Sequence, residues 1–108
     1  MNTNLDLNQQ TLTLHVPVDL TSTSADTLRT EVNGLLEVPD GATRKWNTLK
    51  LDLTTAKMID SVGLNLVVTW FKRVRLHGAK MQITYSNPNV LRTFVFTRLD
   101  KHIELVKI

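Results

Sequence analysis

The 108-residue sequence predicts one α/β domain in which a mixed β-sheet with an N-terminal hairpin is covered by about three α-helices. Three observations support this fold class. Apolar and polar residues alternate near the N-terminus, two longer segments show helical spacing of apolar residues, and short apolar strands separate the helices. The resulting order is ββαβαβαβ. The length suits a single domain, residues 1–108, and the hydrophobic fraction of 42% is sufficient for one core.

The N-terminal hairpin is predicted by two alternating segments joined by a polar turn. Alternation covers residues 5–7 and 12–18, and Asn-Gln-Gln at 8–10 lies between them. A run of hydroxyl side chains that ends at Ser24 can cap the next element. Apolar residues then recur at helical spacing, which predicts a helix over about 24–37.

The central part of the chain is predicted to form a turn, a strand and a long helix. Val-Pro-Asp-Gly at 38–41 is typical of a turn, and Trp46 in the same loop is interpreted as a packing residue. Alternating leucines at 48–53 predict a strand. A helix is expected from Ser61 to about Leu76. Its apolar stripe, expected to face the sheet, consists of Leu64, Val67, Val68, Phe71 and Val74.

The C-terminal part is predicted to add two strands and a short helix. His77-Gly78 should end the long helix, because glycine readily adopts the left-handed conformation that follows a helix end. A strand follows at 80–85. Asn87 before Pro88 is typical of an N-cap followed by proline at the first helical position, and a last strand is expected at 103–106.

Asp60-Ser61-Val62-Gly63 is the most informative local sequence, because it lies between a strand and the start of a helix. A serine at a helix start is expected to be exposed, near backbone N–H groups that lack helical partners. A phosphate on Ser61 would add negative charge beside Asp60. The plain alternative is that Asp60 or Ser61 only caps the helix. Gly63 is expected to permit a close backbone approach near the turn.

Val62, Leu66 and Trp70 form a second apolar ridge on the long helix, at spacings of four residues. One interpretation is a partner-binding strip that begins beside Ser61, with Trp70 as an anchor. The alternative is a widened buried face under the loop at 38–47. The sequence does not decide between them.

Several function classes are disfavoured by the composition. The chain has no cysteine, and His15, His77 and His102 lack metal-ligand spacing, so neither a metal nor another cofactor is expected. No Gly-x-Ser-x-Gly elbow surrounds Ser61, which argues against an enzyme with a serine nucleophile and leaves no catalytic residue. The net charge is +3, but basic and acidic residues are interspersed, so direct nucleic-acid binding is not expected.

The location of the protein is predicted from what the sequence lacks. No apolar run approaches the length of a transmembrane helix, and the N-terminus lacks the pattern of a signal peptide. A cytoplasmic protein without membrane insertion is therefore expected.

The segment LKLDLTTAKMIDSVGLNLVVTWFKRVRLHGAKMQI resembles the strand, Asp-Ser-x-Gly turn, helix and return strand of STAS domains. The resemblance extends through Asn-Pro-Asn-Val at 87–90 and Thr-Arg-Leu-Asp at 97–100. It implies an anti-sigma-factor antagonist. In that scheme a GHKL-type serine kinase, which is itself the anti-sigma factor, phosphorylates the serine at the position of Ser61. The unphosphorylated antagonist binds this kinase and frees the sigma factor, and a serine phosphatase reverses the modification.

The turn identified by the resemblance and the apolar ridge on the long helix together predict a partner-binding site made of Asp60, Ser61, Val62, Gly63, Leu66 and Trp70. The alternative implied by the same family is a non-phosphorylated STAS subunit of a larger signalling or transport complex. Four residues depart from the pattern common in antagonists. Thr21 replaces an aspartate, Ser24 a threonine, Val62 a small hydroxyl residue and Arg98 a glycine.

Overall fold

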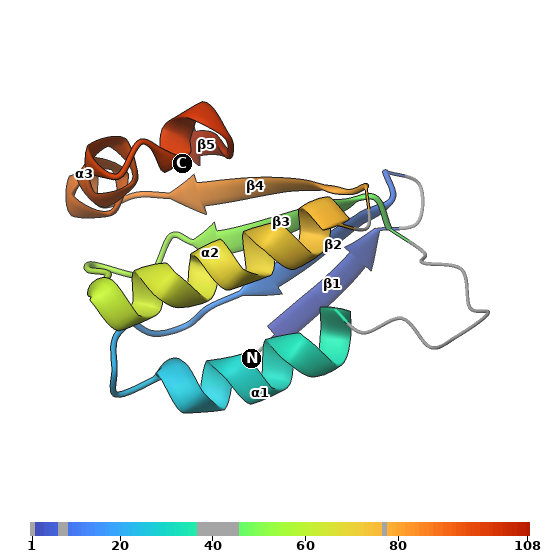
Figure 1. Cartoon of the computed structure of the whole chain (residues 1–108), viewed down its shortest axis with the longest axis horizontal. Coiled ribbons are helices and arrows are strands. Elements are labelled where there is room, and N and C mark those ends of the chain that lie inside the picture. Colours follow the sequence, from blue (N-terminus) through green and yellow to red (C-terminus); the bar gives the residue numbers. More distant parts are fainter. Residues whose placement is uncertain (1, 7–8, 37–45, 77) are drawn as a thin grey trace.

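The computed structural model describes residues 2–6, 9–36, 46–76 and 78–108, with only the backbone of 2–6 and of Leu35. Within these residues the order of elements follows the predicted ββαβαβαβ pattern, with one short 3₁₀-helix before the last strand (Figure 1). The elements are β1 (Asn2–Asp6), β2 (Thr11–His15), α1 (Ala25–Leu36), β3 (Thr48–Leu53), α2 (Ser61–Leu76), β4 (Lys80–Tyr85), α3 (Pro88–Phe96), η1 (Leu99–Lys101) and β5 (Glu104–Lys107).

The strands form one mixed sheet in the order β1-β2-β3-β4-β5. β1 and β2 are antiparallel, with Leu5 opposite Leu12, so the predicted hairpin is confirmed; part of its connection, residues 7–8, lies outside the described residues. The other neighbours are parallel, and Leu12, Leu49 and Met81 share one register across β2, β3 and β4. Parallel neighbours need a crossover, which α1, α2 and α3 supply in turn. The connections that follow β2 and β3 therefore leave the sheet at the same edge.

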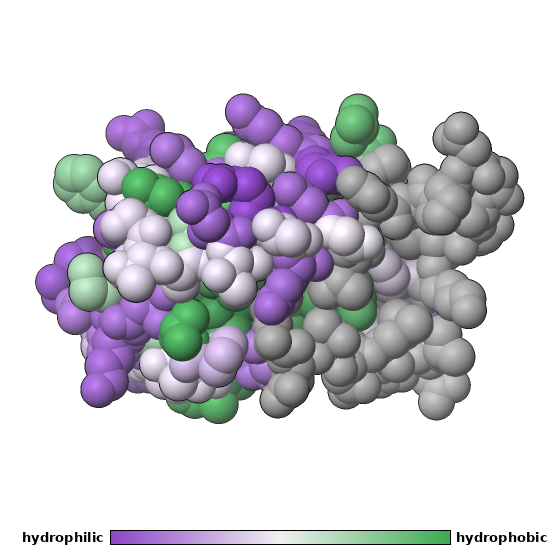
Figure 2. Space-filling model, turned by 90° about the horizontal axis from the view of Figure 1, so that it is seen from below, coloured by the Kyte–Doolittle hydropathy of each residue, from purple (hydrophilic) through white to green (hydrophobic). Residues whose placement is uncertain are grey.

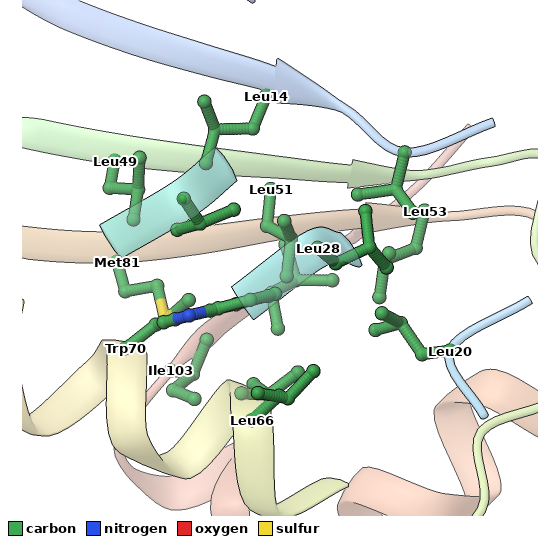
Figure 3. Close-up of a cluster of buried hydrophobic side chains, with 14 of the residues drawn as sticks. Leu14, Leu20, Leu28, Leu49, Leu51, Leu53, Leu66, Trp70, Met81 and Ile103 are labelled. Atoms are coloured by element: carbon green, nitrogen blue, oxygen red, sulfur yellow. The ribbon is translucent and has the colours of Figure 1, made fainter. Parts of the chain in front are cut away.

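One face of the sheet carries the core. Alternate strand residues are buried, as the period of two in a strand requires, and they meet the apolar sides of the helices (Figure 3). α2 packs against both α1 and β4. The fully enclosed large side chains include Leu14, Leu20, Leu49, Leu51, Leu53, Trp70, Ile83 and Phe94. Trp46 is buried as well, which confirms its predicted packing role.

This packing corrects the prediction of which α2 residues are buried and which are exposed to a partner. Leu66 is 3% exposed and Trp70 0% exposed, and both point toward the strands among the other core residues (Figure 3). Their prediction as a partner-binding strip is wrong, because side chains enclosed in the core do not reach a partner. α2 has two buried neighbours, so its buried side is wider than one stripe. Of the stripe predicted to face the sheet, Val67 and Val74 are buried, while Leu64, Val68 and Phe71 are only half-buried.

The predicted helix boundaries are largely confirmed. Oδ1 of Asn87 accepts a hydrogen bond from the N–H of Asn89 at 2.9 Å, and Pro88 is the first residue of α3. Gly78 has φ of 75° and ends the turn after α2, while His77 lies outside the described residues. The role of Ser24 differs from the predicted helix cap. Its hydroxyl donates to the carbonyl of Asp19 at 2.6 Å and accepts from the N–H of Thr21 at 3.2 Å, so it closes the turn before α1.

The surface over α1 is mostly hydrophilic, with small and separate hydrophobic areas among the described residues (Figure 2). No helix in the described part of the chain has the length and apolar character needed to cross a membrane. The loop at 38–45, where a turn was predicted, lies outside the described residues.

Candidate functional site

The connections that follow β2 and β3 are joined by hydrogen bonds at the edge of the sheet where these strands end. The N–H of Lys57 donates to Oδ1 of Asp19 at 2.7 Å, and the N–H of Asp60 donates to the carbonyl of Leu20 at 3.0 Å. Leu20 and Ile59 also form an isolated parallel bridge. The start of α2 is thus fixed to the segment that precedes α1, although the two lie far apart in the sequence.

The Asp60 carboxylate completes this junction. Its Oδ1 accepts from the N–H of Gly63 at 2.9 Å, which makes Asp60 the N-cap of α2, and its Oδ2 accepts from the N–H of Ser22 at 2.9 Å. Hydrogen bonds from these two backbone groups, Gly63 first and then Ser22, hold the pKa of the Asp60 carboxyl below its ordinary value. Of the two capping residues proposed from sequence, Asp60 is therefore the one that caps.

Gly63 lies directly against the backbone of Leu20. A Cβ at position 63 would lie 2.1 Å from the carbonyl oxygen of Leu20 and 2.6 Å from its carbonyl carbon. Only glycine avoids that overlap, so the predicted close approach is confirmed. Gly63 itself is buried, so its contribution to the site is to let α2 start at this place.

Ser61 is the first residue of α2, and it is exposed. Within the described part of the chain its hydroxyl has no hydrogen-bond partner, since Asp60 provides the cap. Val62, beside it, is 36% exposed. The four residues of the predicted turn are therefore brought together with distinct positions: Asp60 and Gly63 fix the helix start, while Ser61 and Val62 face outward.

A pocket of about 380 Å³ lies between the start of α2 and α3, directly beside Ser61. Its wall is almost entirely apolar, and Phe96 at its edge is 88% exposed. The residues that line it are Ile59, Asp60, Ser61, Leu64, Arg92, Thr93, Phe96 and Thr97. The residues of this pocket that come from α3 were not predicted from the sequence. A signal was present, because the apolar run Phe94-Val95-Phe96 is wider than one buried side of a short helix requires.

A second hollow, of about 410 Å³, lies at the opposite end of α2. Arg75, Lys80 and Lys101 line it together with Phe71 and Glu104. The Arg75 guanidinium carbon lies 5.9 Å from the centre of the Phe71 ring. The ring of His102 lies 6.3 Å from that of Phe71. Three basic residues that are dispersed in the sequence therefore line one hollow.

Asp52 forms a polar cluster on the sheet face opposite to the core. Its Oδ2 lies 2.6 Å from Nδ1 of His15, and its Oδ1 accepts from the hydroxyls of Thr54 at 2.7 Å and Thr84 at 3.1 Å. Burial alone would raise the pKa of the Asp52 carboxyl, but the hydrogen bonds from Thr54, His15 and Thr84 outweigh it and lower the pKa. The described residues contain no group of three His, Asp or Glu side chains arranged for a metal ion.

These features define an α/β domain with an exposed, helix-starting serine beside an apolar pocket, an arrangement suited to contact with another protein. The STAS domain model matches residues 2–108, and the chain belongs to the STAS domain family. The resemblance seen in the sequence is thereby confirmed.

Solved structures share this fold. The Thermotoga maritima protein TM1081, a candidate anti-sigma factor antagonist, is 20% identical, with a TM-score of 0.83 over 99% of this chain and 86% of that one. An anti-sigma factor antagonist from Mycobacterium paratuberculosis is 18% identical, with a TM-score of 0.75 over 97% and 84%. The anti-sigma factor antagonist SpoIIAA in its unphosphorylated form is 16% identical, with a TM-score of 0.71 over 97% and 88%. The search of curated proteins gives no match.

Proposed function

We propose that this protein is an anti-sigma-factor antagonist, a protein-binding switch controlled by phosphorylation of Ser61. The observation that supports the proposal most directly is the exposed Ser61 hydroxyl at the start of α2, adjoining an apolar pocket. Structures of the same fold include SpoIIAA in its phosphorylated form, which is 15% identical, with a TM-score of 0.66 over 97% of this chain and 91% of that one. Residues 1–108 act in this proposal as one STAS domain and as a substrate without catalytic activity of its own.

The proposed partner is a GHKL-type serine kinase that is also the anti-sigma factor. The unphosphorylated protein binds the kinase and frees the sigma factor, in the cytoplasm and without contacting nucleic acid. The γ-phosphoryl group of ATP is then transferred to Oγ of Ser61: the new P–O bond forms, the bond to ADP breaks and the hydroxyl proton is released. A serine phosphatase restores the hydroxyl with water.

The contact surface of the proposal differs from the one expected from sequence. Ser61 and Val62 remain in it, while the anchor moves from Trp70 to Phe96, which is far more exposed. An exposed aromatic ring beside a pocket is a common source of binding energy in protein interfaces. A phosphate at Ser61 adds about −1.5 to −2 charges at this surface, next to the Asp60 carboxylate. An acidic partner surface is thereby repelled, and an apolar one could be covered only at the cost of desolvating the phosphate, without refolding of the domain.

The proposal is tested by phosphorylation and binding experiments with the GHKL-type kinase that co-purifies with the protein. Incubation with that kinase and ATP should add one phosphate, and peptide mass spectrometry should locate it on Ser61. Ser61→Ala should bind the kinase and remain unmodified, and Ser61→Asp should bind at least tenfold more weakly. Thr30→Asp, which places the same charge on the exposed side of α1, serves as the control and should bind like the wild type.

Two results would contradict the proposal. If Ser61 acquires no phosphate while the kinase is active on a known substrate, the protein is better described as a non-phosphorylated STAS subunit of a larger complex. If Ser61→Asp and Thr30→Asp weaken kinase binding equally, charge at the start of α2 does not control the association.

A further inference from the structure

Ser61 and Arg92 come from different helices and line the same pocket. Ser61 begins α2 and Arg92 lies in the middle of α3. Leu64 and Phe96, which line the same pocket, are apolar. Ser61, the site of the proposed modification, and the basic residue Arg92 therefore share one pocket.

Arg92 has no anionic partner in the described part of the chain. The ion pairs recorded there join His15 to Asp52 and Arg29 to Asp26, and no hydrogen bond from the Arg92 guanidinium is present. The carboxylate that shares the pocket, Asp60, is already occupied: one oxygen accepts from Gly63 and the other from Ser22. Asp60 therefore stays fixed to the backbone, and Arg92 remains available to an incoming anion.

We propose that Arg92 receives the phosphate of phosphorylated Ser61, and that this ion pair lies across the pocket and closes it to a partner's apolar side chain. The inference deepens the proposed function, since it specifies how the modification acts at that same site. Phosphorylation then has two effects on the contact surface. It adds negative charge, and it covers the apolar wall that the unmodified domain exposes.

The chemistry of the two groups fits this pairing. A phosphoserine carries three acceptor oxygens and nearly two negative charges, and a planar guanidinium donates two parallel hydrogen bonds to such a group. The pair would lie against the apolar wall, where fewer water molecules screen it than on an open surface. A nearby positive charge favours the dianion over the monoanion, so the second pKa of the phosphate falls.

The experiment uses the full chain with phosphoserine incorporated at position 61 during translation, so that no kinase is needed. The phosphate is titrated by ³¹P NMR, and the midpoint for a free phosphoserine lies at about pH 6. The wild type should titrate about 0.5 lower on the pH scale than Arg92→Gln, which is roughly a threefold change in proton affinity. The N–H groups at the start of α2 and the Asp60 carboxylate act on the phosphate in both proteins, so the difference between the two midpoints reports Arg92 alone. Arg75→Gln, at the far end of α2, should titrate like the wild type.

A second measurement tests whether the pair crosses the pocket. Comparison of ¹H–¹⁵N spectra with serine and phosphoserine at 61 should show shifts of the Thr93 and Phe96 amides in the wild type. Arg92→Gln should abolish these α3 shifts and retain those at Val62. Arg92→Lys, which keeps the positive charge but cannot donate two parallel hydrogen bonds, should give an intermediate midpoint. Spectra of each variant also report whether it is folded.

Equal midpoints for the wild type, Arg92→Gln and Arg75→Gln would overturn the inference, as would unchanged α3 amides on phosphorylation. These outcomes are separable from failure of the proposed function. If the kinase does not modify Ser61 but incorporated phosphoserine still responds to Arg92, the pairing stands and the switch does not. If the kinase modifies Ser61 and Arg92→Gln changes nothing, the switch stands and the pairing does not.

Discussion

Replacing Gly63 with alanine is a direct test of the junction between α2 and the segment before α1. The added Cβ would lie 2.1 Å from the Leu20 carbonyl oxygen, 2.6 Å from its carbonyl carbon and 2.8 Å from its Cβ. Two of these atoms are backbone. The Leu20 carbonyl also accepts the hydrogen bond from the N–H of Asp60, and Leu20 is fully buried, so the segment has little freedom to move away.

The expected cost follows from that overlap. Forcing extra atoms into a packed site typically costs about 1–3 kcal/mol, and here the clash is with the backbone of the buried Leu20, so we expect about 3 kcal/mol or more. For a domain of this size that corresponds to a melting temperature lower by roughly 12 °C or more. Urea denaturation followed by circular dichroism measures the free energy of unfolding, and calorimetry measures the melting temperature.

Gly34→Ala is the matched control. Gly34 lies in α1 with no atom within 4 Å of an added Cβ, so alanine there should be neutral or stabilise by about 0.5 kcal/mol through helix propensity. If the free energy of unfolding of Gly63→Ala lies within about 0.5 kcal/mol of the wild-type value, the close approach of α2 to Leu20 is refuted. The same substitution should also weaken binding of the proposed kinase, because Ser61 and Val62 move with the helix start.

Trp70→Ala should lower the free energy of unfolding by about 3–5 kcal/mol. Trp70→Phe should cost far less, because it removes a buried indole N–H that has no partner among the described residues. Arg98 has φ of 62°, so Arg98→Gly should stabilise by about 0.5 to 1 kcal/mol. The lowered pKa of Asp52 stabilises the fold above the pKa of an unfolded aspartate, and this contribution disappears as the pH falls through the folded value. The stability difference between wild type and Asp52→Asn should therefore narrow below roughly pH 4.

Urea unfolding of each variant measures these effects, at several pH values for the Asp52 pair. Tolerance of Trp70→Ala, with loss of partner binding instead, would restore Trp70 to the surface and refute the packing of α2. Destabilisation by Arg98→Gly would show that the Arg98 side chain makes contacts that outweigh its backbone conformation. A stability difference that stays constant down to pH 2 would mean that hydrogen bonds do not lower the pKa of Asp52.

The chain's own periodicity accounted for the order of the elements. Alternating leucines in β3, helical spacing in α2, and Asn87 with Pro88 at the start of α3 are local signals, because each depends on neighbours within a few residues. The local sequence did not decide whether Asp60 or Ser61 caps α2. The hydrogen bond from the N–H of Gly63 shows that Asp60 caps α2. The hydrogen bond from the N–H of Ser22, which is distant in sequence, shows that the same carboxylate also joins two connections.

The sequence by itself determined the ββαβαβαβ order and the position of Ser61 at the start of a helix, because local periodicity and turn composition encode both. Tertiary structure decided which side of α2 is buried. Periodicity gives the angle of Leu66 and Trp70 around the helix, but not that α1 and β4 both pack against it. The pocket beside Ser61 was likewise decided only when α3 brought Arg92 and Phe96 to the start of α2, since no local pattern relates residues on separate helices.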